Sequence, residues 1–171
     1  SNEYGWWKVT GGKVDFEFNG FENNSYGRWR LENGKVNFGY NDIVVDNGQW
    51  RYYYGGRFQD SYTGVTDCGN ANGWWYVKKG VVDFSVNTVA ANKNGWWKVT
   101  NGKVDFSFNG LAPNENGWWK ITDGKVDFDF GGIVSNENGQ WFVRSGRVQF
   151  GYTGTVIIKG VSYHIVSGKV S

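Results

Sequence analysis

Apolar and polar residues alternate on both sides of a short glycine-containing turn, and this pattern recurs along the whole chain. In residues 95–116, GWWKVTNGKVDFSFNGLAPNEN, the dipeptide Asn101-Gly102 separates two such alternating segments. An Asn-Gly pair in this place is a strong signal for a β-hairpin, because a type I′ turn needs positive φ at both central residues. Equivalent dipeptides occur at Gly11-Gly12, Asn33-Gly34, Asp123-Gly124, Ser145-Gly146 and Ser167-Gly168.

A turn at residues 101–102 fixes the register of the two strands and sorts their faces. The expected partners are Thr100 with Lys103, Val99 with Val104, Lys98 with Asp105, Trp97 with Phe106 and Trp96 with Ser107. One face is then wholly apolar and consists of Trp97, Val99, Val104, Phe106 and Phe108. A lone hairpin is not stable in water, so this face is expected to be core, buried against neighbouring hairpins. Residues 109–116 are expected to form a connector.

The same unit occurs eight times, with openings near residues 5, 27, 48, 73, 95, 117, 139 and 161. A fixed period of about 22 residues is the signature of a stacked-repeat architecture. We therefore expect an all-β fold of tandem β-hairpin repeats, here called copies, stacked as a solenoid-like array. Residues 1–171 are expected to form a single repeat domain. The third copy, 48–72, is longer and irregular, which favours a local bulge.

The composition supports strands and limits the kinds of partner. The chain has 27 glycines, one proline and 19% aromatic residues, and the scarcity of alanine and leucine argues against helices. A net charge of +2 is too small to indicate a nucleic-acid or membrane-surface partner. The apolar runs are too short for a membrane-spanning segment or a signal peptide, so neither is expected. Cys68 is the only cysteine, so no intrachain disulfide is expected.

Residue types that carry catalysis or bind metals are sparse. His164 is the only histidine, and it occupies a strand position that is lysine in other copies. No set of His, Cys and carboxylate residues has metal-ligand spacing. Four aspartates recur with the repeat: Asp15, Asp83, Asp105 and Asp127. Recurrence fits cross-strand partners of lysine better than a catalytic pair, which is usually unique in a chain. We therefore expect no enzyme activity, no metal site and no cofactor.

Two aromatic positions at the start of each copy behave differently. The second is aromatic in all copies: Trp7, Trp29, Trp50, Trp75, Trp97, Trp119, Trp141 and Tyr163. On the apolar face, this position is expected to form a stacked aromatic ladder in the core. The first position varies: Trp6, Arg28, Gln49, Trp74, Trp96, Trp118, Gln140 and Ser162. A tryptophan that polar residues can replace is not required by the core, so these indoles either contact a ligand or pack on the neighbouring hairpin.

The stretches GWWKVTNGKVDFSFNG and GWWKITDGKVDFDFGG resemble the cell-wall-binding repeats of Gram-positive bacteria. This group includes choline-binding repeats, glucan-binding repeats of glucosyltransferases and carbohydrate-binding repeats of large clostridial toxins. The shared features are a Gly-Trp opening, an Asn-Gly or Asp-Gly turn before lysine, and an aromatic second strand. The resemblance covers essentially the whole chain. It implies a hairpin solenoid, an exported location, and attachment to wall polymers or glycans through aromatic slots.

These observations favour a non-catalytic cell-wall or carbohydrate-binding module of a bacterial surface protein, secreted or attached to the cell wall. The expected ligand-binding residues are Trp6, Trp74, Trp96 and Trp118, with Lys98 and Lys120 beside the indoles. An indole can stack on the C–H face of a sugar or on a cationic group, and repeated weak sites give avidity for a polymer. The alternative is a structural spacer or a protein-interaction module without a glycan ligand. Exposed tryptophans also allow a homodimer.

Overall fold

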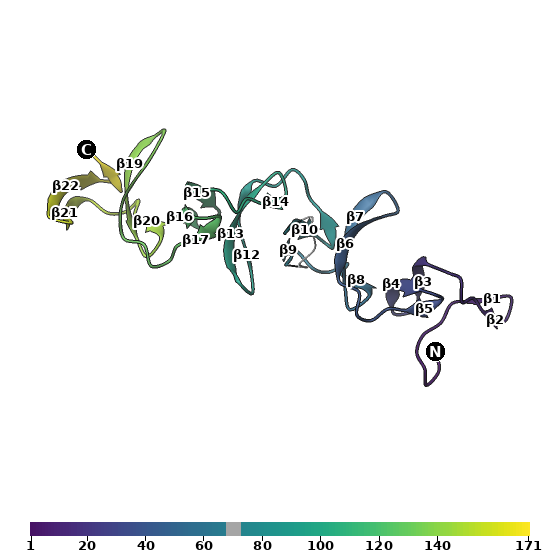
Figure 1. The fold of residues 1–171 in the computed structure, drawn as a ribbon. Coiled ribbons are helices and arrows are strands. Elements are labelled where there is room, and N and C mark those ends of the chain that lie inside the picture. The colour runs from purple at the N-terminus through teal and green to yellow at the C-terminus, as the bar shows by residue number, and fades with distance from the viewer. Residues whose placement is uncertain (68–72) are drawn as a thin grey trace. The chain divides into compact units, whose positions relative to one another are not determined.

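A computed structural model describes residues 1–67 and 73–171, and every regular element in these residues is a β-strand. This confirms the predicted all-β class and the tandem hairpins. The chain forms two compact units, Ser1–Phe84 and Ser85–Ser171, and the single repeat domain over residues 1–171 stays a prediction. Within each unit the hairpins follow one another along the chain (Figure 1). No helix in the described residues is long and apolar enough to cross a membrane, and Cys68 lies outside these residues.

In most of both units, two long strands are followed by one short strand. Unit Ser1–Phe84 contains β1 (Val9–Thr10), β2 (Lys13–Val14), β3 (Gly20–Asn24), β4 (Gly27–Glu32), β5 (Lys35–Val36), β6 (Asp42–Asp46), β7 (Gln49–Tyr54), β8 (Arg57–Phe58), β9 (Gly64–Val65), β10 (Tyr76–Lys78) and β11 (Val81–Val82). Unit Ser85–Ser171 contains β12 (Thr88–Asn92), β13 (Gly95–Thr100), β14 (Lys103–Val104), β15 (Gly110–Asn114), β16 (Gly117–Thr122), β17 (Lys125–Val126), β18 (Gly132–Asn136), β19 (Gly139–Arg144), β20 (Arg147–Val148), β21 (Gly154–Ile158), β22 (Val161–Val166) and β23 (Lys169–Val170).

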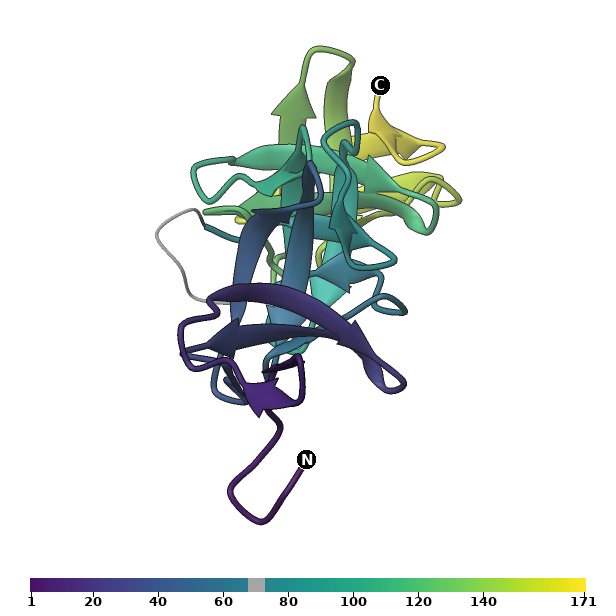
Figure 2. The ribbon, with the colours of Figure 1, turned by 90° about the vertical axis from the view of Figure 1, so that its right-hand side faces the viewer.

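Each regular repeat is built from two long strands and one short strand. In unit Ser85–Ser171, β16 pairs with β15 on one side and with the two-residue strand β17 on the other. The turn between β16 and β17 holds Asp123 at φ 48° and Gly124 at φ 76°, the positive values that its dipeptide predicts. Figure 2 shows the same ribbon from another side.

The hairpin at residues 101–102 is shorter than its sequence pattern predicts. The pairs Val99–Val104 and Thr100–Lys103 are confirmed, whereas the predicted pairs Trp97–Phe106 and Trp96–Ser107 are wrong. The reason is local. The Asp105 carboxylate accepts hydrogen bonds from the backbone N (3.0 Å) and the hydroxyl (2.7 Å) of Ser107, and this Asx turn ends the strand. Phe106, predicted to be core, is therefore 45% exposed.

The residues that were expected to form a connector are a strand. Residues 110–114 form β15, in which Ala112 lies opposite Trp119 and is buried. Gly110 and Pro113 argue against a strand in the sequence, because both residue types are rare inside strands. The structure accommodates the proline because β15 pairs only with β16 and is therefore an edge strand.

Successive copies are joined through the central long strand. Trp97 lies opposite Lys125 of the next copy, and the backbone N of Lys98 donates a hydrogen bond to Gly124 O at 2.8 Å. The same bridge between copies occurs at Trp29–Arg57, Trp119–Arg147 and Trp141–Lys169. Beside these bridges, Val99 and its counterparts Ile121 and Val143 are fully buried. The solenoid-like stacking of the whole array stays a prediction.

The strand register shows that the third copy is offset by one residue from the alignment of copies made from the sequence. β7 begins at Gln49, whereas Gly48 lies in the preceding turn with φ 72°. The pairing of Arg51 with Val81 places Arg51, not Trp50, at the second aromatic position. Trp50 therefore occupies the first position, which the sequence analysis had given to Gln49.

A basic side chain of the next copy explains the glycine that opens most copies. Gly95 has φ 138°, and a Cβ there would lie 2.5 Å from Cε of Lys125. The same contact joins Gly5 to Lys35, Gly27 to Arg57, Gly117 to Arg147 and Gly139 to Lys169. The third copy has Gln49 at this position, and the fourth copy has Val81 in place of the basic residue. Glycine and the basic residue are thus replaced together.

Replacing Gly95 with alanine is expected to destabilise unit Ser85–Ser171. Alanine at this φ is strained by about 1–3 kcal/mol, and its Cβ must also displace the Lys125 side chain. Urea unfolding followed by tryptophan fluorescence measures the loss. Gly131→Ala is the matched control, because Gly131 is exposed and has no atom within 4 Å of its Cβ position. Equal unfolding midpoints for the two variants would contradict this explanation.

Candidate ligand-binding site

Three aromatic rings from two successive copies meet at one place in a junction. The ring centroid of Trp96 lies 5.0 Å from that of Trp119, and Phe128 lies 5.8 Å and 5.7 Å from these two rings. All three pairs meet edge to face, a favourable geometry for aromatic rings. Trp119 is 8% exposed and Phe128 is 44% exposed, so the group has a buried base and an exposed rim. We call a group of this composition an aromatic cluster.

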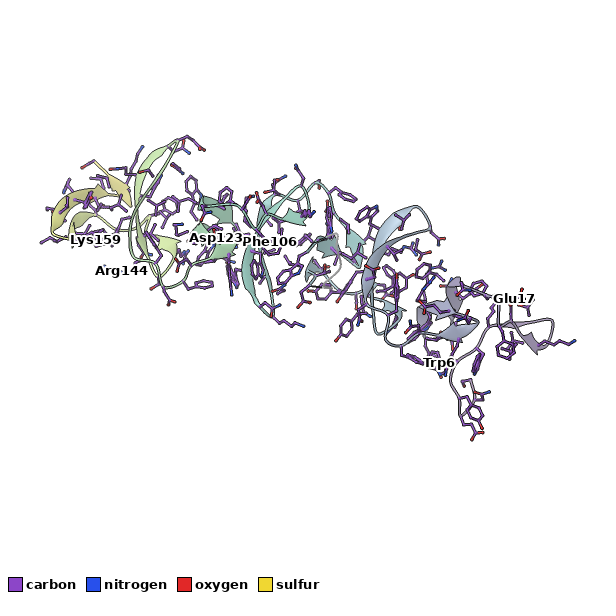
Figure 3. The ribbon with its side chains drawn as sticks, in the orientation of Figure 1. Trp6, Glu17, Phe106, Asp123, Arg144 and Lys159 are labelled. Carbon is purple, nitrogen blue, oxygen red and sulfur yellow. The ribbon has the colours of Figure 1, made fainter. Side chains whose placement is uncertain are left out.

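Three other junctions carry the same arrangement, in which the first tryptophan of one copy meets the second tryptophan and a phenylalanine of the next. These aromatic clusters are Trp6–Trp29–Phe38, Trp50–Trp75–Phe84 and Trp118–Trp141–Phe150. Their centroid distances lie between 4.9 and 5.7 Å. Figure 3 labels Trp6 of the first cluster. A repeated group with an exposed aromatic rim is typical of a binding surface.

The second tryptophan of a cluster is fixed by two neighbours. The indole Nε1 of Trp119 donates a hydrogen bond to Asn114 Oδ1 at 2.8 Å, and the same oxygen accepts the backbone N–H of Asn116 at 2.9 Å. The Arg147 guanidinium of the next copy lies 5.7 Å from the Trp119 ring centroid, a cation–π contact. With Trp96 in the preceding copy, one cluster therefore depends on three successive copies.

The first cluster adjoins a cavity with a charged pair. The cavity has a volume of about 240 Å³, and Trp6 and Trp29 lie among its lining residues. Lys8 and Glu22 also line it and form an ion pair, with Lys8 Nζ 2.5 Å from Glu22 Oε1. A fourth ring, that of Tyr26, lies 5.3 Å from Trp6. This cluster therefore has a cavity, an ion pair and a fourth aromatic ring beside its three aromatic members.

The structure separates the tryptophans that the sequence predicted as one binding face. Trp6, Trp96 and Trp118 each lie in an aromatic cluster and are half-buried, and Trp74 is also half-buried. Trp96 and Trp118 do not share a cluster, because each contacts the second tryptophan of the following copy. The predicted ladder of second aromatics is likewise replaced by contacts between the first and the second position. Their role in binding a ligand stays a prediction.

Lys98 and Lys120, expected beside the indoles, each contact a phenylalanine, and their role beside the indoles stays a prediction. Lys98 Nζ lies 5.8 Å from the Phe108 ring centroid and donates a hydrogen bond to Val99 O at 2.8 Å. Burial lowers the pKa of Lys98, an effect that the nearby Asp105 partly offsets. Lys120 Nζ lies 5.7 Å from the ring centroid of Phe130.

Sequence reasoning missed the rim phenylalanine of the clusters. Strand alternation assigned its position, represented by Phe106 and Phe128, to the core. The signal that could have identified it is Asp60, which occupies this position in the third copy. A carboxylate is rarely buried without a partner, so a position that accepts aspartate is expected to be exposed.

One junction carries charged residues at the positions where four others carry an aromatic cluster. Arg28 Nε and Nη2 each donate a hydrogen bond of 2.6 Å to the Asp46 carboxylate, and Tyr53 OH donates another of 2.6 Å. Arg51 Nη1 lies 3.3 Å from the same carboxylate, which is only 5% exposed at residue level. The hydrogen bond from Arg28 is the main cause that lowers the pKa of Asp46. Burial and the bond to Asp46 raise the pKa of Tyr53. We call these four residues the ionic cluster.

The described residues contain no group of three His, Cys, Asp or Glu side chains that could hold a metal ion. Their repeated feature is the aromatic cluster, so the geometry is that of a tandem-repeat module with rings gathered at its junctions. The chain belongs to the choline-binding repeat family. The family model matches residues 17–37, 61–83, 85–105, 107–127 and 129–149, which together make up more than half of the chain. Comparison with curated proteins gives no significant match.

The family match coincides with the structural repeat. The matched stretch 107–127 contains β15, β16 and β17, and the matched stretch 85–105 contains β12, β13 and β14. Repeats of this family bind choline-containing cell-wall polymers, which confirms the predicted resemblance at the level of a choline- or carbohydrate-binding module. The matched stretches leave out residues 38–60, which contain Asp46 and Arg51.

Asp46→Asn is expected to destabilise unit Ser1–Phe84 by about 3–5 kcal/mol at neutral pH, because it leaves two guanidinium groups without their carboxylate. The pKa of Asp46 is lowered in the folded state, so its contribution is complete above the ordinary Asp pKa of about 3.9 and is lost as the pH falls below it. The stability difference between wild type and Asp46→Asn should therefore shrink from pH 7 to pH 3.

Urea unfolding at both pH values measures this difference, with Asp129→Asn as the control. Asp129 is exposed, so its replacement should change stability little at either pH. A difference between wild type and Asp46→Asn that does not depend on pH would show that the carboxylate charge is not what stabilises this junction.

Proposed function

We propose that this protein is a non-catalytic binding module of an exported bacterial surface protein, and that its aromatic clusters bind the choline groups of a cell-wall polymer. The observation that carries this proposal is the aromatic cluster, which recurs with the same composition at four junctions. The family assignment supports the ligand class, because choline-binding repeats are generally binding modules and are typical of cell-surface proteins.

The chemistry of a cluster suits a quaternary ammonium group. Such a group has no N–H to donate, so its nitrogen makes no hydrogen bond to a carboxylate or carbonyl, and it gains much from the faces of aromatic rings. Three rings at about 0.5–2 kcal/mol each would contribute about 1.5–6 kcal/mol. A millimolar dissociation constant corresponds to about 4 kcal/mol, which lies inside this range. A single cluster is therefore expected to bind choline weakly.

Repetition is what makes weak clusters useful. Unit Ser85–Ser171 contains the clusters of Trp96 and Trp118, and unit Ser1–Phe84 contains those of Trp6 and Trp50. A polymer that carries many choline groups engages several clusters at once, and each further contact is intramolecular. The module is thus expected to retain a wall polymer while single choline molecules exchange rapidly.

Choline should bind the clusters in solution and perturb their indole N–H groups. In NMR titrations, the Nε1–H signals of Trp29, Trp119 and Trp141 are expected to shift saturably with choline chloride. The neutral isostere 3,3-dimethylbutan-1-ol has the same shape without the charge, so it should bind several-fold more weakly. Equal affinity for the two compounds would contradict recognition through cation–π contacts.

Trp96→Gln tests one cluster alone. Glutamine already occupies the first position at Gln140, so the fold is expected to tolerate it, and the variant should lose the choline response of Trp119 only. Lys98→Gln is the matched control, because Lys98 lies on the same strand but contacts Phe108. A full response of Trp119 in the folded Trp96→Gln variant would remove Trp96 from the site.

Wall binding is tested by retention on purified Gram-positive cell walls that carry choline. The module should be retained, and free choline in the millimolar range should elute it. Walls without choline should not retain it. Retention that free choline cannot compete would favour a glycan ligand, and the absence of retention on either wall would favour the structural spacer.

A further inference from the structure

The ionic cluster occupies the positions that form an aromatic cluster elsewhere. Counted from the turn dipeptides, each of its residues lies 68 positions before a counterpart in unit Ser85–Ser171. The counterparts are Arg28 and Trp96, Asp46 and Asn114, Arg51 and Trp119, Tyr53 and Ile121, and Asp60 and the rim residue Phe128. Even the contacts are parallel: Arg51 Nη1 donates to Asp46 Oδ2, as Trp119 Nε1 donates to Asn114 Oδ1, in both cases five residues earlier.

Internal cations already cover the rings at this junction. The Arg28 guanidinium lies 6.0 Å from the Phe21 ring centroid, and the Arg51 guanidinium lies 5.0 Å from that of Phe58. Both side chains are mostly buried, with 16% of each exposed. No tryptophan occupies the two indole positions of this junction, and Asp60 stands in place of the rim phenylalanine, so the three rings that form an aromatic cluster elsewhere are not present here to receive a quaternary ammonium group.

The charge balance opposes a further cation. Two guanidinium groups share one buried carboxylate, so the buried charges of Arg28, Arg51 and Asp46 sum to a net positive charge, whereas the Asp60 carboxylate at the rim position is exposed to water. Adding a positive ligand to a mostly buried group of this kind requires desolvation of the ligand without a new counterion. The Asp46 carboxylate already accepts hydrogen bonds of 2.6 Å from Arg28 and Tyr53, so it is engaged by internal donors and does not serve as a counterion for a ligand.

We infer that the junction between the second and third copies is closed to choline and is held together by its own charges instead of by a ligand. This inference rests on the proposed function. According to this inference, Arg28, Asp46 and Arg51 are the residues that prevent choline from binding at this junction. In unit Ser1–Phe84, ligand would bind at the junction before the closed one and at the junction after it, two copies apart.

A first test uses the native protein and needs no variant. During an NMR titration with choline chloride, the indole N–H signals of Trp29 and Trp75 should shift saturably. The Nε–H signals of Arg28 and Arg51 should stay unchanged over the same range. Saturable shifts of both arginine signals with the affinity of the indoles would overturn the inference and leave the proposed function intact. The absence of any indole shift would overturn the proposed function and the inference with it.

A second test exchanges the two kinds of junction. The variant Trp96→Arg, Asn114→Asp, Trp119→Arg, Ile121→Tyr, Phe128→Asp carries the ionic set in unit Ser85–Ser171 and should bind one choline fewer per chain than wild type. The reverse variant, Arg28→Trp, Asp46→Asn, Arg51→Trp, Tyr53→Ile, Asp60→Phe, should bind one more. Isothermal titration calorimetry gives both stoichiometries, and circular dichroism reports folding.

The outcomes are distinct for each variant. Unchanged choline stoichiometry in the folded variant that carries the ionic set would overturn the inference, because these residues would then not close a junction. A gained site in the folded reverse variant would support it, and a folded reverse variant without a gained site would contradict it. Where either variant fails to fold, the arginine signals of the native protein decide.

Discussion

The contact between one repeat and the next is the constraint on which the whole structure depends. A long strand such as β16 pairs with β15 on one edge, and its other edge pairs with the short strand β17 and, at Trp119, with β20 of the next copy. The indole at its centre is covered when Arg147 of that next copy lies over it, and the same side chain crosses Gly117. Opening glycine, second tryptophan and basic residue are therefore three parts of one contact. No copy completes its core alone.

The aromatic clusters follow directly from this stacking. Because the second tryptophan is fixed by the asparagine five residues before it and by a basic residue of the next copy, the first tryptophan of the preceding copy has one place to pack. Packing and ligand binding are consequently not alternatives for Trp96, which is half-buried in the absence of ligand and still stands beside an exposed phenylalanine. A ligand at such a cluster contacts two copies, so its binding also stabilises their association.

At the junction between the second and third copies, several residues of the contact between repeats are replaced together. A single arginine in place of a buried tryptophan would leave an unpaired charge in the interior, which is costly. Here Arg28 and Arg51 are accompanied by Asp46 in place of asparagine and by Tyr53 in place of an aliphatic residue, so every buried charge has a partner. Gln49 and Val81 likewise replace the glycine and the basic residue together. The interactions differ, but the register between copies is kept.

The repeat, the strand class and the turns can be predicted from the sequence, because they depend on local chemistry: turn dipeptides such as Asn101-Gly102 and Asp123-Gly124 adopt positive φ at both residues. The sequence could not determine how far each short strand continues, since a local Asx turn at Asp105 competes with pairing to Trp97. It also placed the rim phenylalanines in the core. Their exposure depends on the packing between copies, because the neighbour that covers each indole comes from the next copy, almost 30 residues further along the chain.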